Sequence, residues 1–258
     1  MEETGKNPIQ VAERLFQVIE RLAENGPMGI MDLSAELGFH KSTTHRLVTS
    51  LQYMGYIRQD EESLKYALSL KFLEIGSKIL EQTNMASLIH PSLKKLSEQT
   101  GETVHLVRRE GTEAVYIDKV ESTVSSIRMV SRVGSRIPLY CSGVGKAIMA
   151  TLPDEEVKKI WNESIIEKKT DKTITDFSQM QEVLEEVRQN GYALDDEENE
   201  KGVRCIAACL HGYQKEVKYA FSISGPTSRM TRERVKELAV DVKKVQEELS
   251  RELGYYKS

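Results

Sequence analysis

Residues 38–56 read "GFHKSTTHRLVTSLQYMGY", and this stretch decides how the N-terminal part of the chain is interpreted. It combines a glycine, a run of hydroxyl-bearing residues and an apolar pattern with helical spacing. From Gly38 to Gln59 there is no Asp or Glu, where the average composition would place roughly three. The basic side chains here are Lys41, Arg46 and Arg58, with His40 and His45 beside them. A small cationic region therefore lies within a chain whose net charge is −4.

Two short helices are predicted around Gly38. The first begins after Gly29, a tolerated N-cap, and ends at Gly38, a residue that commonly terminates helices. Only two residues then precede a helix that begins near Lys41. Two amphipathic helices joined by such a tight turn form a helix-turn-helix unit. The side chains expected to point inward from the later helix are Thr44, Leu47, Val48, Leu51 and Met54.

The flanking sequence extends this unit to a winged helix. An earlier helix is indicated by apolar residues at helical spacing, and "NGP" at residues 25–27 ends it. The stretch "GYIRQDEESLKYALS" predicts a hairpin with strands at Tyr56–Gln59 and Lys65–Leu68. A long helical pattern follows it. The expected domains are 1–68 for the winged helix, 69–87 for a linker helix and 88–258 for the remainder.

The remainder of the chain alternates strand patterns with helix patterns. Strands are predicted at "TVHLVRRE", "EAVYIDKVES", "SSIRMVS", "RCIAACLHG" and "VKYAFSISG". Helices are predicted at Pro91–Thr100, Gly143–Thr151, Asp154–Asn162, Phe177–Asn190 and Arg229–Leu253. Consecutive strands with helices outside them indicate an α+β domain built on an antiparallel sheet.

The bulk composition narrows the class of protein. With 258 residues, 39% of them hydrophobic, the chain is long enough to bury a sizeable core. No window is apolar enough for a membrane span, and the first residues lack the features of a signal peptide, so we expect a cytoplasmic protein with no membrane partner. The three cysteines are too few for a disulfide framework and are expected to be reduced thiols.

The cationic region predicts contacts with double-stranded DNA. The second helix of a helix-turn-helix lies in the major groove, where its N-terminal residues meet base edges and phosphates. Hydroxyl-bearing and basic side chains can donate hydrogen bonds to phosphates and to the edges of DNA bases. The residues expected to bind DNA are Lys41, Ser42, Thr43, His45 and Arg46, with Arg58 and Lys65 on the hairpin touching flanking phosphates. The alternative is an ordinary solvated helix, for which exposed Lys and Arg are common.

The stretch "GIMDLSAELGFHKSTTHRLVTSLQYMGYI" resembles the winged helix of the IclR family of bacterial transcription regulators. "SRVGSRIPLYCSGVGKAIMA", "GYALDDEENEKGVRCIAACL" and "FSISGPTSRMT" resemble its later signatures, so the likeness covers nearly the whole chain. It implies a winged helix joined by a linker helix to a GAF-like α/β effector domain, in a homodimer or homotetramer that acts as a repressor. "IRMVSRVGSRIPLY" and "LGYY" resemble the subgroup that controls pectin and hexuronate catabolism, whose inducer is 2-keto-3-deoxygluconate.

The resemblance also implies a site for a small organic-acid effector. The matching positions are Ile137, Gly143, Val144, Gly145, Asp195, Cys205, Ser222 and Ser224. Independently of it, glycines at a helix N-terminus let backbone N–H groups approach an anion. The two serines of "FSISG" face one side of a strand. The alternative is that the glycines only shape a turn and the serines only face solvent.

Other chemistries are weaker alternatives. "SGVGK" is not a phosphate-binding loop, because Tyr140 and Ala147 replace the required glycine and hydroxyl. Cys205, Cys209 and His211 share a strand face but would lie about 13 and 7 Å apart, too far for one metal ion. No base is evident for a cysteine nucleophile, so neither a cofactor nor an enzyme is expected. An enzyme acting on a small carboxylate and a winged helix that binds protein rather than DNA both stay open.

Overall fold

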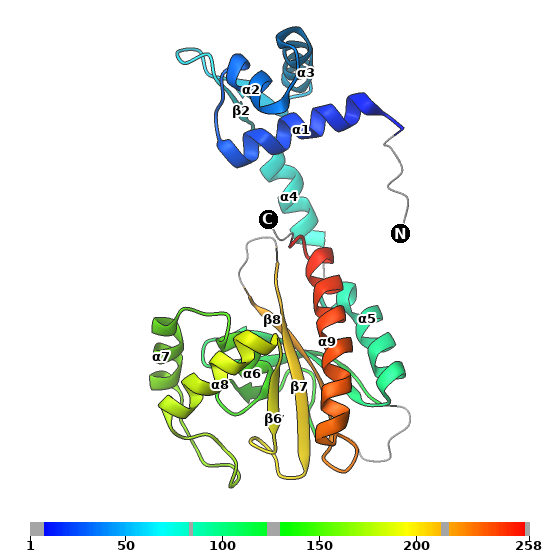
Figure 1. Ribbon diagram of the computed structural model, residues 1–258, viewed down its shortest axis with the longest axis vertical. Coiled ribbons are helices and arrows are strands. Elements are labelled where there is room, and N and C mark those ends of the chain that lie inside the picture. Colours follow the sequence, from blue (N-terminus) through cyan, green and yellow to red (C-terminus); the bar gives the residue numbers. More distant parts are fainter. Residues whose placement is uncertain (1–7, 83–84, 123–129, 213–216, 256–258) are drawn as a thin grey trace. The chain divides into compact units, whose positions relative to one another are not determined.

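The computed structural model describes residues 8–82, 85–122, 130–212 and 217–255, except the side chains of residues 77 and 79–82 (Figure 1). Its contacts divide the chain into two compact units, Met1–Thr83 and Asn84–Ser258. The helix predicted to link the domains therefore belongs to the first unit by its contacts. The finer division at residues 68 and 87 stays a prediction. Among the described helices, none has the length and apolarity needed to cross a membrane.

The first unit is a three-helix head followed by a hairpin and a further helix. Its elements are α1 (Gln10–Asn25), α2 (Ile30–Leu37), α3 (Lys41–Tyr53), β1 (Ile57–Gln59), β2 (Tyr66–Leu68) and α4 (Lys71–Gln82). Gly38 ends α2 with φ of 65°, in the left-handed region that favours glycine. The N–H groups of Gly38 and Phe39 donate to Ala35 and Ser34 carbonyls, which closes the turn. The predicted helix-turn-helix is confirmed.

The head has its own apolar core. Val48 is fully buried in it, and the hairpin adds Ile57 and Tyr66. Met54 was expected to point inward, but it is 38% exposed. The prediction was wrong because α3 ends at Tyr53, so Met54 caps the helix beyond its last inward-facing turn.

The second unit is an antiparallel sheet with helices on both faces. Six strands lie in the order β5-β4-β3-β8-β7-β6. They are β3 (Thr103–Glu110), β4 (Glu113–Val120), β5 (Arg136–Pro138), β6 (Ala193–Asp196), β7 (Val203–Leu210) and β8 (Tyr219–Pro226). The helices are α5 (Met85–Thr100), α6 (Gly143–Met149), α7 (Asp154–Glu163), α8 (Phe177–Asn190) and α9 (Arg232–Glu252).

Each face of this sheet has a separate apolar core. One face packs against α5 and α9 through side chains such as Leu106 and Phe221. The other packs against α6, α7 and α8 through Val107 and Ala207, and Figure 1 shows these helices on the opposite side of the sheet from α9. Because side chains alternate along a strand, every second residue faces α6. The predicted α+β class is confirmed.

Several boundaries differ from those predicted. Helix α5 starts at Met85 rather than Pro91, because the buried Ile89 extends the apolar stripe and the helix continues through the proline. Strands β5 and β6 were not predicted: β5 is very short, and β6 ends in two aspartates, which are unusual in strands. The strand predicted at residues 125–131 falls mostly outside the described residues, and its last two residues are not in a strand.

Candidate functional site: the start of α3 and a buried polar face

Helix α3 presents the predicted DNA-binding side chains to solvent. Lys41, Ser42, His45 and Arg46 are exposed, and Thr43 is half-buried. In the part of the chain that the structure describes, none of these five side chains forms an ion pair or hydrogen bond. The buried Thr44 faces the core as expected, and its hydroxyl contacts the His40 carbonyl at 3.4 Å. The start of α3 therefore offers free donors next to the positive end of the helix dipole.

The hairpin carries charges of both signs. Arg58 and Lys65 are exposed, on the arms of the hairpin, as predicted. The turn between them contains Asp60, Glu61 and Glu62, which are also exposed. The backbone N–H and hydroxyl of Ser63 donate to Asp60 at 2.8 and 2.7 Å and lower the pKa of its carboxyl. Lys65 adjoins this acidic turn, because the Asp60 N–H donates to its carbonyl at 2.9 Å, whereas Arg58 lies farther from the tip, opposite Ala67. Negative charge at the tip opposes phosphate contacts there.

In the second unit, α6 begins against the polar part of the sheet. Ser142 caps the helix: its hydroxyl accepts from the Gly145 N–H at 3.1 Å and donates to the Pro138 carbonyl at 2.7 Å. A Cβ on Gly145 would lie 2.1 Å from the backbone oxygen of Leu139, so this glycine is required for packing. We had expected the Gly145 N–H to be available to an anion, but it is already used by the cap.

The other predicted α6 residues keep their place in the candidate site. A Cβ on Gly143 would meet Ala207 and the Asp195 backbone at 3.4 Å, which is ordinary contact. The N–H groups of Gly143 and Val144 have no hydrogen-bond partner within the described ranges. Ile137 is buried on β5, opposite Ala114.

Strand register brings the remaining predicted residues together. Asp195, Cys205 and Ser224 are direct partners across β6, β7 and β8, and Ser224 is paired in turn with Thr103 on β3. Ser222 lies two residues from Ser224 on the same face, opposite His105. These polar residues form a band on the face that α6 covers.

His105 was not singled out from the sequence, although it lies between the apolar residues Val104 and Leu106. Its Nδ1 lies 3.3 Å from Ser224 Oγ, which lies 3.3 Å from Ser222 Oγ. Its Nε2 lies 2.7 Å from Ser131 Oγ. Burial, with a smaller effect of the Lys119 charge, lowers the pKa of His105 to about 3, so the imidazole is neutral near pH 7.

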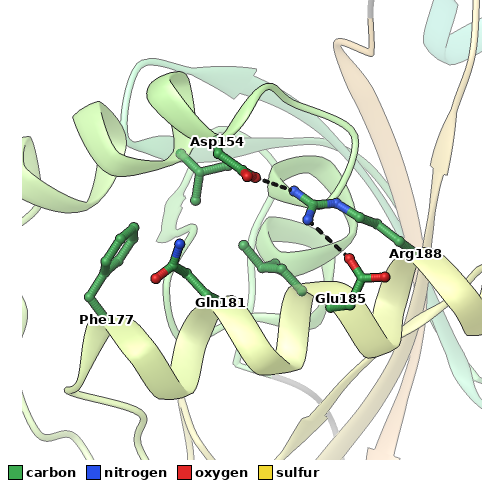
Figure 2. A pocket seen from close by; sticks show the side chains of 7 residues that line it. Asp154, Phe177, Gln181, Glu185 and Arg188 are labelled. Atoms are coloured by element: carbon green, nitrogen blue, oxygen red, sulfur yellow. Dashed lines mark hydrogen bonds and ion pairs between the residues drawn. The ribbon is translucent and has the colours of Figure 1, made fainter.

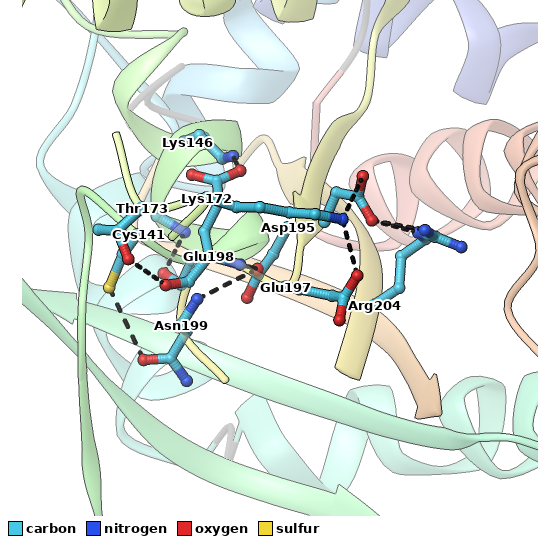
Figure 3. A network of polar contacts seen from close by, with 12 residues as sticks. Cys141, Lys146, Lys172, Thr173, Asp195, Glu197, Glu198, Asn199 and Arg204 are labelled. Atoms are coloured by element: carbon cyan, nitrogen blue, oxygen red, sulfur yellow. Dashed lines mark hydrogen bonds and ion pairs between the residues drawn. The ribbon is translucent and has the colours of Figure 1, made fainter. Parts of the chain in front are cut away.

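A buried charged cluster lies at the other end of this band (Figure 3). Lys146 of α6 is 1% exposed and forms an ion pair with Glu198. Asp195 Oδ1 accepts from the N–H groups of Glu198 and Asn199, at 2.8 and 3.3 Å. Burial raises the pKa of Asp195 to about 7, opposed by the Lys146 ammonium and assisted by the Glu198 carboxylate. Lys146 and Glu198 were not singled out from the sequence.

A separate hollow lies between α7 and α8 (Figure 2). It contains none of the predicted effector residues. Arg188 lies on its rim, where it contacts Asp154 at 2.9 Å, Glu185 at 3.3 Å and the Ala150 carbonyl at 2.9 Å. With its charge already paired, this arginine holds the two helices together.

Comparison with known proteins assigns the family. A model described as the IclR helix-turn-helix domain matches residues 11–61, and one described as the bacterial transcriptional regulator IclR C-terminal matches residues 77–251. The chain belongs to the IclR family of bacterial transcriptional regulators. It is a DNA-binding regulator and not an enzyme, as the family resemblance predicted.

Individual members of the IclR family match over nearly the whole chain. The transcriptional repressor IclR of Escherichia coli is 36% identical, covering 95% of this chain and 90% of that protein. The regulator KdgR of the same organism is 34% identical, covering 97% and 96%. The crystal structure of the Thermotoga maritima IclR superposes with a TM-score of 0.65 at 32% identity, covering 95% of this chain and 99% of that one. The two Escherichia coli identities are nearly equal, so they do not favour one subgroup.

The three cysteines are free thiols that are buried or half-buried. Burial raises the pKa of Cys141 and Cys209 to about 11, and burial raises the pKa of Cys205 further, so all three are thiols near pH 7. Cys209 Sγ lies 3.5 Å from Nε2 of His211, whose ring stacks on Tyr255. Among the described residues, no cluster of three or more His, Cys, Asp or Glu side chains could hold a metal ion.

Proposed function

We propose that this regulator is a repressor that binds an operator through α3 and releases it when an acid binds the second unit. The single observation that supports DNA binding is at the start of α3. There, exposed hydrogen-bond donors lie together with no carboxylate among them. The proposed contacts are Lys41, Ser42, Thr43, His45 and Arg46 from α3, with Arg58 and Lys65 from the hairpin. A cytoplasmic location follows from this role.

The proposed effector is a small organic acid that carries keto or hydroxyl groups. The band of Ser222, Ser224, Cys205 and Asp195 supports this class, because it offers hydroxyl and carboxyl partners beside free backbone N–H groups of α6. The specific candidate is 2-keto-3-deoxygluconate, the inducer implied by the resemblance to the subgroup that controls pectin and hexuronate catabolism. Asp195 suits an acid ligand when it is protonated, since it then donates rather than repels.

We further propose that the regulator acts as a homodimer or homotetramer. Two heads can read palindromic half-sites about 34 Å apart or at multiples of this distance. Val11 and Phe16 on α1 are 60% and 61% exposed, which supports an apolar contact between copies. Sedimentation of the full chain would test this, and a monomer at micromolar concentration would contradict it.

A thermal-shift panel of keto and hydroxy acids, including 2-keto-3-deoxygluconate and pyruvate, tests the sensing role. A ligand at a hundred times its Kd should add about 2.7 kcal/mol of stability. DNA affinity for promoter fragments near the gene is then measured with and without each binding acid. Equal affinity in both conditions would exclude effector control, since a ligand shifts an equilibrium only through differential binding.

A further inference from the structure

Lys146 is a buried cation next to the proposed effector residues. It follows Gly143, Val144 and Gly145 on α6, and only Glu198 pairs with it among the described side chains. Apart from the neutral His105, the other buried basic residue of the described chain is Arg204, which is held by Asp196 at 2.6 Å and by the Met230 carbonyl. Arg204 neighbours Cys205 on β7, so it faces the opposite side of the sheet. Lys146 is therefore the buried positive charge on the effector side.

The ammonium of Lys146 already has a counter-ion. Glu198 pairs with it directly, and the carboxyl of Asp195, whose pKa is raised by burial, lies close by. Glu198 is 7% exposed, and its Oε2 is buried with no hydrogen-bond partner among the described residues. A buried carboxylate oxygen without a donor is costly. Glu198 is thus a counter-ion for Lys146 that uses only one of its two carboxylate oxygens for pairing among the described residues.

Adding the carboxylate of a ligand beside an ammonium that is already paired with Glu198 would leave excess negative charge in a buried place, even with Asp195 protonated. An acid that enters next to α6 must therefore displace a carboxylate or bring a proton with it. Glu198 is the carboxylate in direct contact with Lys146, whereas Asp195 is held by two backbone N–H groups. Glu198 is the group that can leave.

Glu198 is also attached to the segment that joins α7 to α8. We call residues 164–176 the strap. Thr173 Oγ1 donates to the Glu198 carbonyl at 2.6 Å, and Thr170 Oγ1 donates to the Glu197 carbonyl at 2.6 Å. Lys169 Nζ donates to Asn199 Oδ1 at 2.9 Å. Two of these bonds end on backbone carbonyls, so a displacement of Glu198 that shifts the backbone of this turn would reach the strap.

We propose that Lys146 binds the carboxylate of the acid effector, and that Glu198 holds the place of that carboxylate until the effector displaces it and loosens the strap. This inference rests on the proposed sensing function. It names Lys146 as the side chain that binds the negative charge of the ligand. It also predicts that acid binding changes the mobility of the strap in the second unit.

Binding of 2-keto-3-deoxygluconate and pyruvate to the full chain, measured by calorimetry, tests the inference, with pyruvamide as an uncharged analogue. Glu198→Gln removes the competing charge and should tighten acid binding about tenfold or more. The double variant Lys146→Met/Glu198→Gln removes both charges together, so no buried ion is left unpaired, and should lose acid binding. Glu182→Gln is the control: it removes an exposed carboxylate on α8, outside the strap and the turn that holds Glu198, and should leave affinity unchanged.

Hydrogen exchange of the wild-type strap provides a readout independent of the variants. If the acid displaces Glu198, exchange at residues 165–173 should rise at least severalfold on binding. A purely structural ion pair predicts slower exchange and weaker or unchanged binding by Glu198→Gln, and either result would overturn the inference. If the wild-type chain binds these acids but the variants and the exchange do not behave as expected, the proposed sensing function is kept and the role of Lys146 and Glu198 is rejected. If it binds neither acid, both proposals are wrong.

Discussion

The polar side chains of α3 and those that face α6 lie in opposite environments. The exposed ones at the start of α3, such as Lys41 and Arg46, form no ion pair or hydrogen bond among the described residues, so they are available to a partner that brings its own charge. Facing α6 they are buried and mostly engaged with one another, as in the chain from Ser131 through His105 to Ser224. A partner of the first surface only adds contacts, whereas a ligand of the second must replace contacts that exist. If these proposed sites are correct, we expect salt to control affinity at the first surface and competition with internal contacts to control it at the second.

The largest expected effect comes from the packing beneath α6. In Gly145→Ala, the new Cβ would collide with the Leu139 backbone, which should destabilise the second unit by about 3 kcal/mol or more. Trp161, the single tryptophan, packs between Tyr140 and Phe177 and reports this unfolding by fluorescence. Gly143→Ala is the control, because its Cβ has room. Equal stability of the two variants would contradict the packing role.

The next effect is on the pH dependence of stability, and it tests whether the buried carboxyl of Asp195 is protonated in the folded chain. The pKa of Asp195 is raised to about 7 in the folded chain, above its ordinary value of about 4 in the unfolded chain. Its stabilisation is therefore fully present below about pH 4 and lost as the pH rises towards 7, by a few kcal/mol, since one pKa unit corresponds to about 1.4 kcal/mol. Asp195→Asn should flatten this dependence in urea titrations followed by Trp161. Asp241→Asn, an exposed change on α9, should not. A wild-type slope in Asp195→Asn would show that the carboxyl is ionised throughout.

A smaller effect is expected on the exposed surface. Arg46→Ala should weaken binding to a promoter fragment by roughly 1 to 3 kcal/mol if the guanidinium reads a base. Fluorescence anisotropy with labelled duplex measures this, and Arg251→Ala on α9 is the matched control. Intact DNA affinity in Arg46→Ala would favour a head that binds protein instead.

The smallest effect concerns the hairpin. Lys65→Ala should lower the slope of log affinity against log salt concentration by about 0.9, the value for one phosphate contact. Glu62→Gln, in the acidic turn, removes a repulsion and should leave that slope unchanged while slightly raising affinity. An unaltered slope in Lys65→Ala would place this lysine away from the backbone of DNA.

The same contrast explains how far the sequence could be interpreted. The head follows from local patterns, because Gly38 and the spacing of Leu47, Val48 and Leu51 are sufficient to place α2 and α3. The band facing α6 depends on strand register: Ser224 meets His105 from a position far along the chain. Lys146 could not be recognised as a buried cation, because its partner Glu198 is 52 residues away and lies in an irregular turn. Resemblance to the family supplied Asp195 and Cys205, but it could not indicate which charges were already paired.

The raised pKa values of the three thiols also make this protein convenient to label. Alkylating reagents and peroxides attack the thiolate, and very little thiolate forms near neutral pH at Cys141, Cys205 or Cys209. All three lie in the second unit. A fluorophore attached to a cysteine introduced on the head would therefore report on DNA while all three native cysteines are kept, and oxidants should react slowly with the thiols beside the proposed effector residues.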